Sequence, residues 1–289
     1  MMKPSSKIFL YCLYAIVALA FFLYIRFPSR IMKEILLNQL RQAQPEAHLS
    51  VDEISPTFPP GIKLAPLSVS YADIPVIRMD ELDVTPRLLS LFGNNKRFGL
   101  QGSLGDGQLQ GEADTLFDAN ERQAQITINL SRVPLEFLEI LNQYPGIRSD
   151  GQMDARVNFD SNKGGGTADV GLEISSARIT LDPPLMGIET LEFNLIKAQL
   201  SVSPRMVQIR SCDASGDQLE GKITGSIVFR NPVEESRMTL SLTLKPQPAF
   251  VSDHKNDMIG GLLASDNAQL RGLVFRISGT LNNPHYVIR

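Results

Sequence analysis

The sequence predicts a mostly β protein: a curved antiparallel sheet with a few short helices, preceded by one N-terminal transmembrane helix. Three observations carry this prediction. Residues 8–25 form an unbroken apolar run without Gly, Pro or charge. From about residue 49 onward, apolar and polar residues alternate in many short segments, which is typical of strands with one apolar face. Related Gly/Asp turn units recur at Asp106, Asp150 and Gly216, each opening an alternating segment.

The apolar run is long enough for a membrane helix. About 18 residues, rising about 1.5 Å each, span most of a hydrocarbon core about 30 Å thick. Tyr11, Tyr14 and Tyr24 lie near its ends, where aromatic rings favour the headgroup level. The alternative is a cleaved signal peptide, which needs a small-x-small cleavage site. The run instead ends in bulky apolar residues before Arg26, so we expect an uncleaved signal anchor over residues 8–27.

The anchor divides the chain into a short tail and a long domain. Positive residues flank both ends of the anchor, so the positive-inside bias is weak. A long domain is translocated largely regardless of its charge. We therefore expect residues 1–7 in the cytoplasm and residues 47–289 as a β-rich domain outside it.

A membrane-proximal helix is expected between them, over residues 28–46. Its apolar positions Ile31, Ile35, Leu36 and Leu40 follow helical spacing. This helix either caps the β domain or lies against the membrane surface.

Inward-facing positions of the alternating strands form the candidate binding site. Strict alternation places every second residue on the same face of a sheet. The candidates for the lining of an apolar groove are Ile126, Ile128, Leu130, Ala155, Val157, Phe159, Val170 and Leu172. These residues either fill a closed core or line an open apolar surface for a ligand or partner.

Composition and motifs give no sign of catalysis. The 289 residues carry a net charge of −3, and no basic groove with interleaved aromatics indicates nucleic-acid binding. His48, His254 and His285 stand in unrelated contexts without the spacing of a metal site. Cys12 lies in the anchor and Cys212 in the domain, so we expect no disulfide within one subunit. We expect a protein that is not an enzyme and has no catalytic residues, cofactor or metal.

These features together resemble the AsmA-like proteins of Gram-negative envelopes, and more closely the type II secretion system protein N family (GspN). The resemblance is carried by the anchor through Pro28, by Phe58–Leu64, by the three turn units and by Phe275–His285. It implies a single-pass inner-membrane protein with its C-terminal domain in the periplasm. It also implies membership of a machine that exports folded proteins across the outer membrane, with other secretion-system subunits as partners.

Two function classes follow from the resemblance. In the first, the protein is a non-catalytic structural or protein-binding subunit of the type II secretion system. In the second, it is an AsmA-like lipid-binding or lipid-transfer protein whose apolar groove holds a phospholipid or an acyl chain. The groove of the large AsmA-like lipid-transfer proteins is far longer than this domain can build, so the sequence favours the first class.

Overall fold

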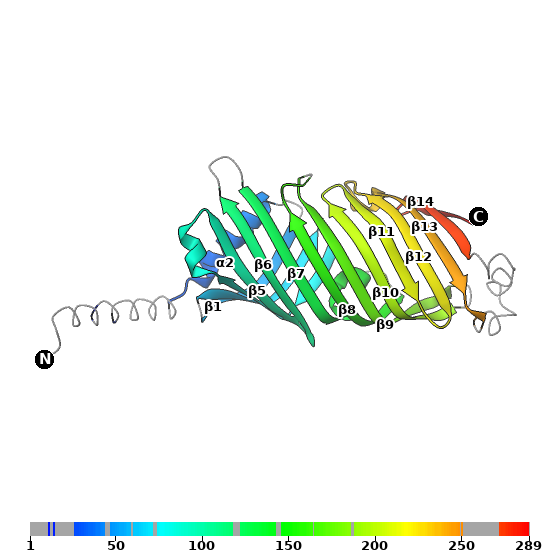
Figure 1. The fold of residues 1–289 in the computed structure, drawn as a ribbon, viewed down its shortest axis with the longest axis horizontal. Helices are drawn as coiled ribbons and strands as arrows, with labels where there is room; N and C mark the ends of the chain where they lie inside the picture. The colour runs from blue at the N-terminus through cyan, green and yellow to red at the C-terminus, as the bar shows by residue number, and fades with distance from the viewer. Residues whose placement is uncertain are drawn as a thin grey trace.

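A computed structural model describes most of the domain. The described residues are 11, 14, 26–43, 47–58, 60–71, 74–117, 122–142, 146–163, 165–185, 188–248, 250 and 272–288. They form one large antiparallel sheet that is not closed, with a helix at its N-terminal end (Figure 1). The prediction of a mostly β, antiparallel fold is confirmed.

The sheet has fifteen strands, and almost every strand pairs with its neighbour in sequence. The spatial order runs from β1 through β2 and β4 to β15, and β3 pairs with β2 beside this path. The strands are β1 (Ala47–Thr57), β2 (Gly61–Tyr71), β3 (Ile74–Met79), β4 (Glu81–Pro86), β5 (Asn95–Leu104), β6 (Gly107–Phe117), β7 (Arg122–Pro134), β8 (Ile147–Asp160), β9 (Thr167–Leu185), β10 (Ile188–Ser203), β11 (Met206–Ser215), β12 (Leu219–Val228), β13 (Arg237–Pro246), β14 (Leu273–Thr280) and β15 (Pro284–Ile288).

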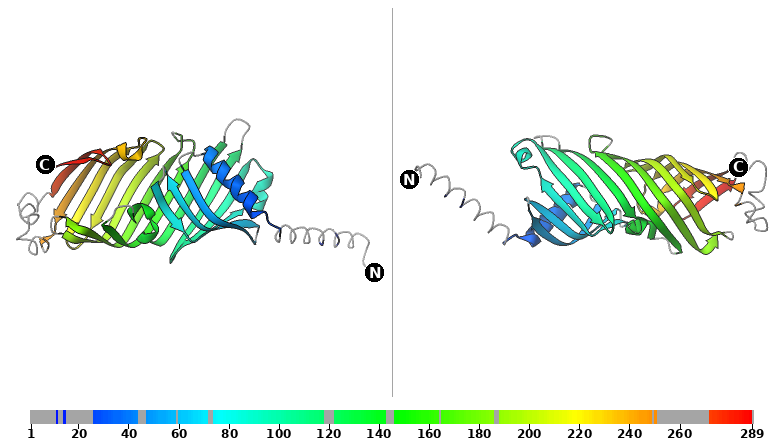
Figure 2. Two further views of the ribbon diagram at one scale, coloured as in Figure 1. Left: turned by 180° about the vertical axis from the view of Figure 1, so that it is seen from behind. Right: turned by 60° about the horizontal axis from the view of Figure 1, so that its bottom comes forward.

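The N-terminal part of the sheet curls over the middle part. Figure 2 shows β1 to β4 lying across the strands that follow them. The larger core fills the space between these layers, because it joins Val51 and Leu64 to Leu104, Val133 and Met153. A smaller core lies farther along the sheet and contains Ala177, Phe193, Leu219 and Phe250.

One long helix, α2 (Ser29–Ala43), occupies most of the segment predicted as membrane-proximal. It packs on β1, with Leu36 against the larger core and the Lys33 ammonium 3.4 Å from the Asp52 carbonyl oxygen. The predicted apolar stripe is only partly correct. Ile31 and Ile35 are exposed, because the side of the helix that packs on the sheet carries Met32 and Leu36 instead.

Short helices interrupt the sheet in few places. They are η1 (Leu88–Phe92), η2 (Leu135–Phe137), α3 (Glu139–Asn142) and η3 (Val233–Glu235). Two of the three turn units open a new strand, after the β5–β6 and β11–β12 turns. The third, at Asp150, differs: it lies inside β8, where Gly151 has a φ of 141° and the register with β9 shifts.

The predicted anchor lies almost wholly outside the described residues. Within residues 8–27 the structure describes only Tyr11, Tyr14, Arg26 and Phe27. Among the described residues, no helix has both the length and the apolar character needed to cross a membrane. The predicted tail, residues 1–7, also lies outside them.

Candidate functional site

The register of three neighbouring strands brings the eight predicted lining residues onto one face. Leu130 of β7 is opposite Ala155 of β8, which is opposite Leu172 of β9. Ile128, Val157 and Val170 form the next row in the same way. Ile126 and Phe159 begin a third row.

These three rows continue through β14, well beyond the residues predicted from the sequence. We call the side of the sheet that carries them the apolar face. The first row contains Leu130, Ala155, Leu172, Ala198, Cys212, Ile223, Leu242 and Phe275. The second row contains Ile128, Val157, Val170, Leu200, Ile209, Gly225, Leu240 and Ile277. The third row contains Ile126, Phe159, Ala168, Val202, Val207, Ile227, Met238 and Gly279.

A bulge in β11 keeps these rows continuous. The pairing of β11 with both neighbours shifts between Ile209 and Cys212, so both side chains fall on the apolar face. Arg210 and Ser211 interrupt the alternation of apolar and polar residues, so the sequence of β11 does not show the pattern expected of a strand with one apolar face. The apolar pair Val207 and Ile209 was the local signal that could have revealed it.

The apolar face is long relative to a lipid. From β7 to β14 there are seven strand spacings of about 4.8 Å, which gives a length of about 34 Å. This length is similar to the thickness of a bilayer's hydrocarbon core, about 30 Å.

The apolar face is partly exposed along most of its length. All eight predicted lining residues are half-buried. Three of them, Ile128, Leu130 and Ala155, pack against the larger core. The other five belong to neither core cluster, so the interpretation as a closed, side-chain-filled core holds only near the N-terminal end.

The opposite face of the sheet is charged and solvated. Ion pairs link neighbouring strands across it: Arg178 with Glu192 at 2.9 Å, Lys197 with Glu173 at 3.3 Å and Lys222 with Asp213 at 3.4 Å. Arg210 of β11 reaches across β10 to Asp169 of β9, at 2.8 Å. A hollow of ≈ 460 Å³ lies among Lys197, Asp213, Glu220 and Lys222 on this face. Its walls are mixed, because Leu195 and Ala214 line it together with these charged side chains.

Cys212 lies on the apolar face, opposite Ala198. Burial raises the pKa of its thiol, and the negative charge of Asp213 adds to this effect. The thiolate is disfavoured, so Cys212 is a poor nucleophile at neutral pH.

Asp80, just before β4, and Glu81, its first residue, each make a contact with another part of the fold. The Gly105 N–H donates to Asp80 Oδ2 at 2.6 Å, and Lys63 Nζ lies 2.8 Å from Glu81 Oε2. This hydrogen bond to Glu81, together with the charge of Asp83, raises the pKa of Lys63. In the part of the chain that the structure describes, no group of three or more His, Cys, Asp or Glu side chains could hold a metal ion.

Comparison of the chain with protein-family models, with curated proteins and with solved structures finds no match.

Proposed function

We propose that this protein binds lipid acyl chains along its apolar face, as a membrane-anchored periplasmic component of the type II secretion system. The binding rests on the structure of the sheet. Membership of the secretion system rests on the sequence resemblance to the type II secretion system protein N family and to AsmA-like envelope proteins.

The single observation that carries the binding is the half-exposed apolar face. Large contiguous apolar patches on soluble domains mark surfaces for ligands, membranes or partners. Burying each methylene of an acyl chain contributes about 0.8 kcal/mol, and the attraction is non-directional. A surface of Val, Leu and Ile without inward charges therefore suits a chain of methylenes better than a polar ligand.

The position of the proposed anchor supports this ligand class. An inner-membrane anchor at residues 8–27 ends immediately before α2, so the domain starts at the membrane surface. Membrane lipids are then the most abundant apolar molecules within its reach.

A second candidate function is that of a protein-binding structural subunit. It is favoured by β15, which among the described strands pairs only with β14. Its Tyr286 and Val287 are exposed, at 68% and 58%. An edge strand of this kind presents backbone groups to which a partner's strand can pair.

Photo-crosslinking of the full chain tests the lipid proposal. The chain is reconstituted in vesicles that contain a phospholipid with a photoreactive acyl chain, irradiated, digested and mapped by mass spectrometry. We expect adducts on peptides from β8 to β13. Adducts confined to residues 8–27 would contradict lipid binding and favour the structural subunit.

Two neighbouring residues of β13 provide a matched pair for this experiment. Leu240 lies on the apolar face, and the adjacent Thr239 lies on the opposite face and is exposed. We expect Leu240→Asp to lower the yield of adducts on β12 and β14 severalfold, because an acyl chain would desolvate the new charge. Thr239→Asp should leave the yield unchanged.

A further inference from the structure

The turn between β4 and β5 places apolar side chains in solvent. Four of the five residues of η1 are apolar, and none of the five is buried. Leu89 and Phe92 are 92% and 93% exposed, and Leu88 is 52% exposed. In a 3₁₀-helix, residues three apart are eclipsed, so Leu89 and Phe92 project from the same side.

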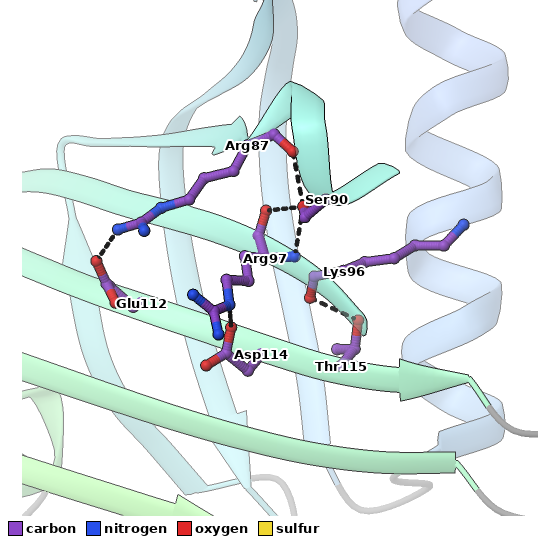
Figure 3. A network of polar contacts seen from close by, with 7 residues as sticks. All are labelled: Arg87, Ser90, Lys96, Arg97, Glu112, Asp114 and Thr115. Carbon is purple, nitrogen blue, oxygen red and sulfur yellow. Dashed lines mark hydrogen bonds and ion pairs between the residues drawn. The ribbon is translucent and has the colours of Figure 1, made fainter. Parts of the chain in front are cut away.

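Ser90, the single polar residue of η1, points the other way. Ser90 Oγ donates to the Arg87 carbonyl oxygen at 2.6 Å and accepts from the Arg97 N–H at 2.9 Å (Figure 3). The Arg87 N–H donates to the Arg97 carbonyl oxygen at 2.8 Å, which closes the turn against β5. Ion pairs of Arg87 with Glu112 and of Arg97 with Asp114 connect the same region to β6. The turn is therefore held by polar contacts that present its apolar side chains outward.

A further exposed apolar residue lies at the same end of the sheet. Phe58, in the turn between β1 and β2, is 92% exposed. The two turns are neighbours, because a Cβ on Gly61 would lie 3.2 Å from Thr85 Oγ1, just ahead of η1. We call Phe58, Leu88, Leu89 and Phe92 the apolar rim.

The apolar rim lies at the end of the molecule where the chain enters α2. Figures 1 and 2 show η1 and α2 at this end of the sheet, with β14 at the other. The first turns of α2 expose Ile31 and Ile35, at 58% and 46%. The segment leading into α2 is the apolar run of residues 8–25.

We propose that the apolar rim inserts into the interface of the bilayer that holds the N-terminal anchor, and so fixes the tilt of the sheet on the membrane. The proposal rests on the anchor of the proposed function. Exposed Leu and Phe next to basic residues are typical of segments that lie in a lipid interface. Around η1 the basic residues are Arg87, Lys96 and Arg97, of which Arg87 and Arg97 are paired with Glu112 and Asp114 of β6.

Single-tryptophan variants of the full chain test this proposal, because the natural chain contains no Trp. Leu89→Trp and Phe92→Trp place the probe in the apolar rim at exposed positions that tolerate a larger side chain. Val287→Trp is the matched control: it is exposed in β15, at the far end of the sheet, and lies opposite Arg276 rather than on the apolar face. Each variant is reconstituted in phosphatidylglycerol-containing vesicles with or without brominated acyl chains, which quench nearby Trp.

We expect the emission of the two rim probes to shift to shorter wavelength and to lose intensity with brominated lipid, while the Val287→Trp emission does neither. If the protein floats with vesicles but the rim probes are quenched no more than the control, the rim proposal is overturned and the anchor is left intact. Failure to float with vesicles overturns the anchor and the rim together. If the Trp emission of the rim probes shifts to shorter wavelength only at high protein concentration, and brominated lipid does not quench it, the rim contacts another copy of the chain. This result would also overturn the proposal.

Discussion

Two glycines of this sheet, one in β12 and one in β9, affect the stability of the fold in opposite ways. Gly225 lies in β12 with a φ of 140°, and a Cβ there would lie 2.2 Å from the Thr239 carbonyl oxygen. Gly171 lies in β9, and a Cβ there would meet nothing within 4 Å. The first allows the close approach of β12 and β13, whereas the second only adds freedom to the unfolded chain.

Replacing each of these glycines by alanine should therefore change stability in opposite directions. Gly225→Ala should lower the free energy of unfolding by about 1–3 kcal/mol, because it strains the backbone in this region of φ. Gly171→Ala should raise it by about 0.4–1 kcal/mol through the unfolded state. Urea unfolding of both variants in one detergent measures the difference. Equal effects would show that the β12–β13 pairing is wrong.

Cys212 should react slowly with a water-soluble alkylating agent. Its raised pKa means that the thiolate becomes abundant only above the usual thiol pKa of about 8.5, so the rate should rise with pH beyond that value. Peptide mapping separates Cys212 from Cys12, and the same chain in urea gives the reference rate. A folded-state rate equal to the rate in urea would contradict its partial burial on the apolar face.

At the scale of elements, the strands and their apolar face could be predicted because alternation is local. Ile126 and Val157 each have polar residues on both sides in sequence, Val170 lies between Asp169 and Gly171, and all three lie on the predicted face. The bulges could not be predicted, because Asp150-Gly151 reads like a hairpin turn and only pairing with β9 defines it as a bulge. The packed side of α2 could not be predicted either, because contact with β1 and not the helical period alone selects it.

The two faces of β8 give a direct test of this register. Phe159→Asp should lower the free energy of unfolding by about 2–4 kcal/mol, because it removes a large side chain and places a charge on the apolar face. Asn158→Asp is the control: this residue is exposed on the opposite face, and Asp retains the oxygen that Thr127 Oγ1 contacts. Thermal unfolding followed by circular dichroism distinguishes them. If Asn158→Asp were destabilised and Phe159→Asp were not, the assignment of these two side chains to the two faces of β8 would be wrong.

At the scale of the whole molecule, protection from solvent is uneven. Leu104 and Val133 of the larger core are 0% exposed and Val51 is 2% exposed, where the curled layers meet. The last strand, in contrast, is mostly exposed. The curl itself could not be predicted, since it depends on which strands pack face to face across the core.

Hydrogen exchange of the full chain should therefore follow a gradient. We expect the slowest exchange in β2, β5 and β7 and the fastest in β15, because opening a segment requires exposure of the apolar area it buries. Mass spectrometry of digested samples gives the profile along the chain. Uniform exchange from β2 to β15 would contradict a sheet stabilised mainly at its N-terminal end.

The neighbour-to-neighbour order of the strands makes the molecule modular. Because each strand from β5 to β14 pairs only with the strand before it and the strand after it, a hairpin can be added or removed without rewiring the rest. One hairpin changes the length of the sheet by about 10 Å and keeps the direction of every later strand. Removal of a single strand would instead reverse those directions. The length of this protein is therefore set in steps of two strands, which makes hairpin number the natural variable by which such a sheet is fitted to the span it must cover.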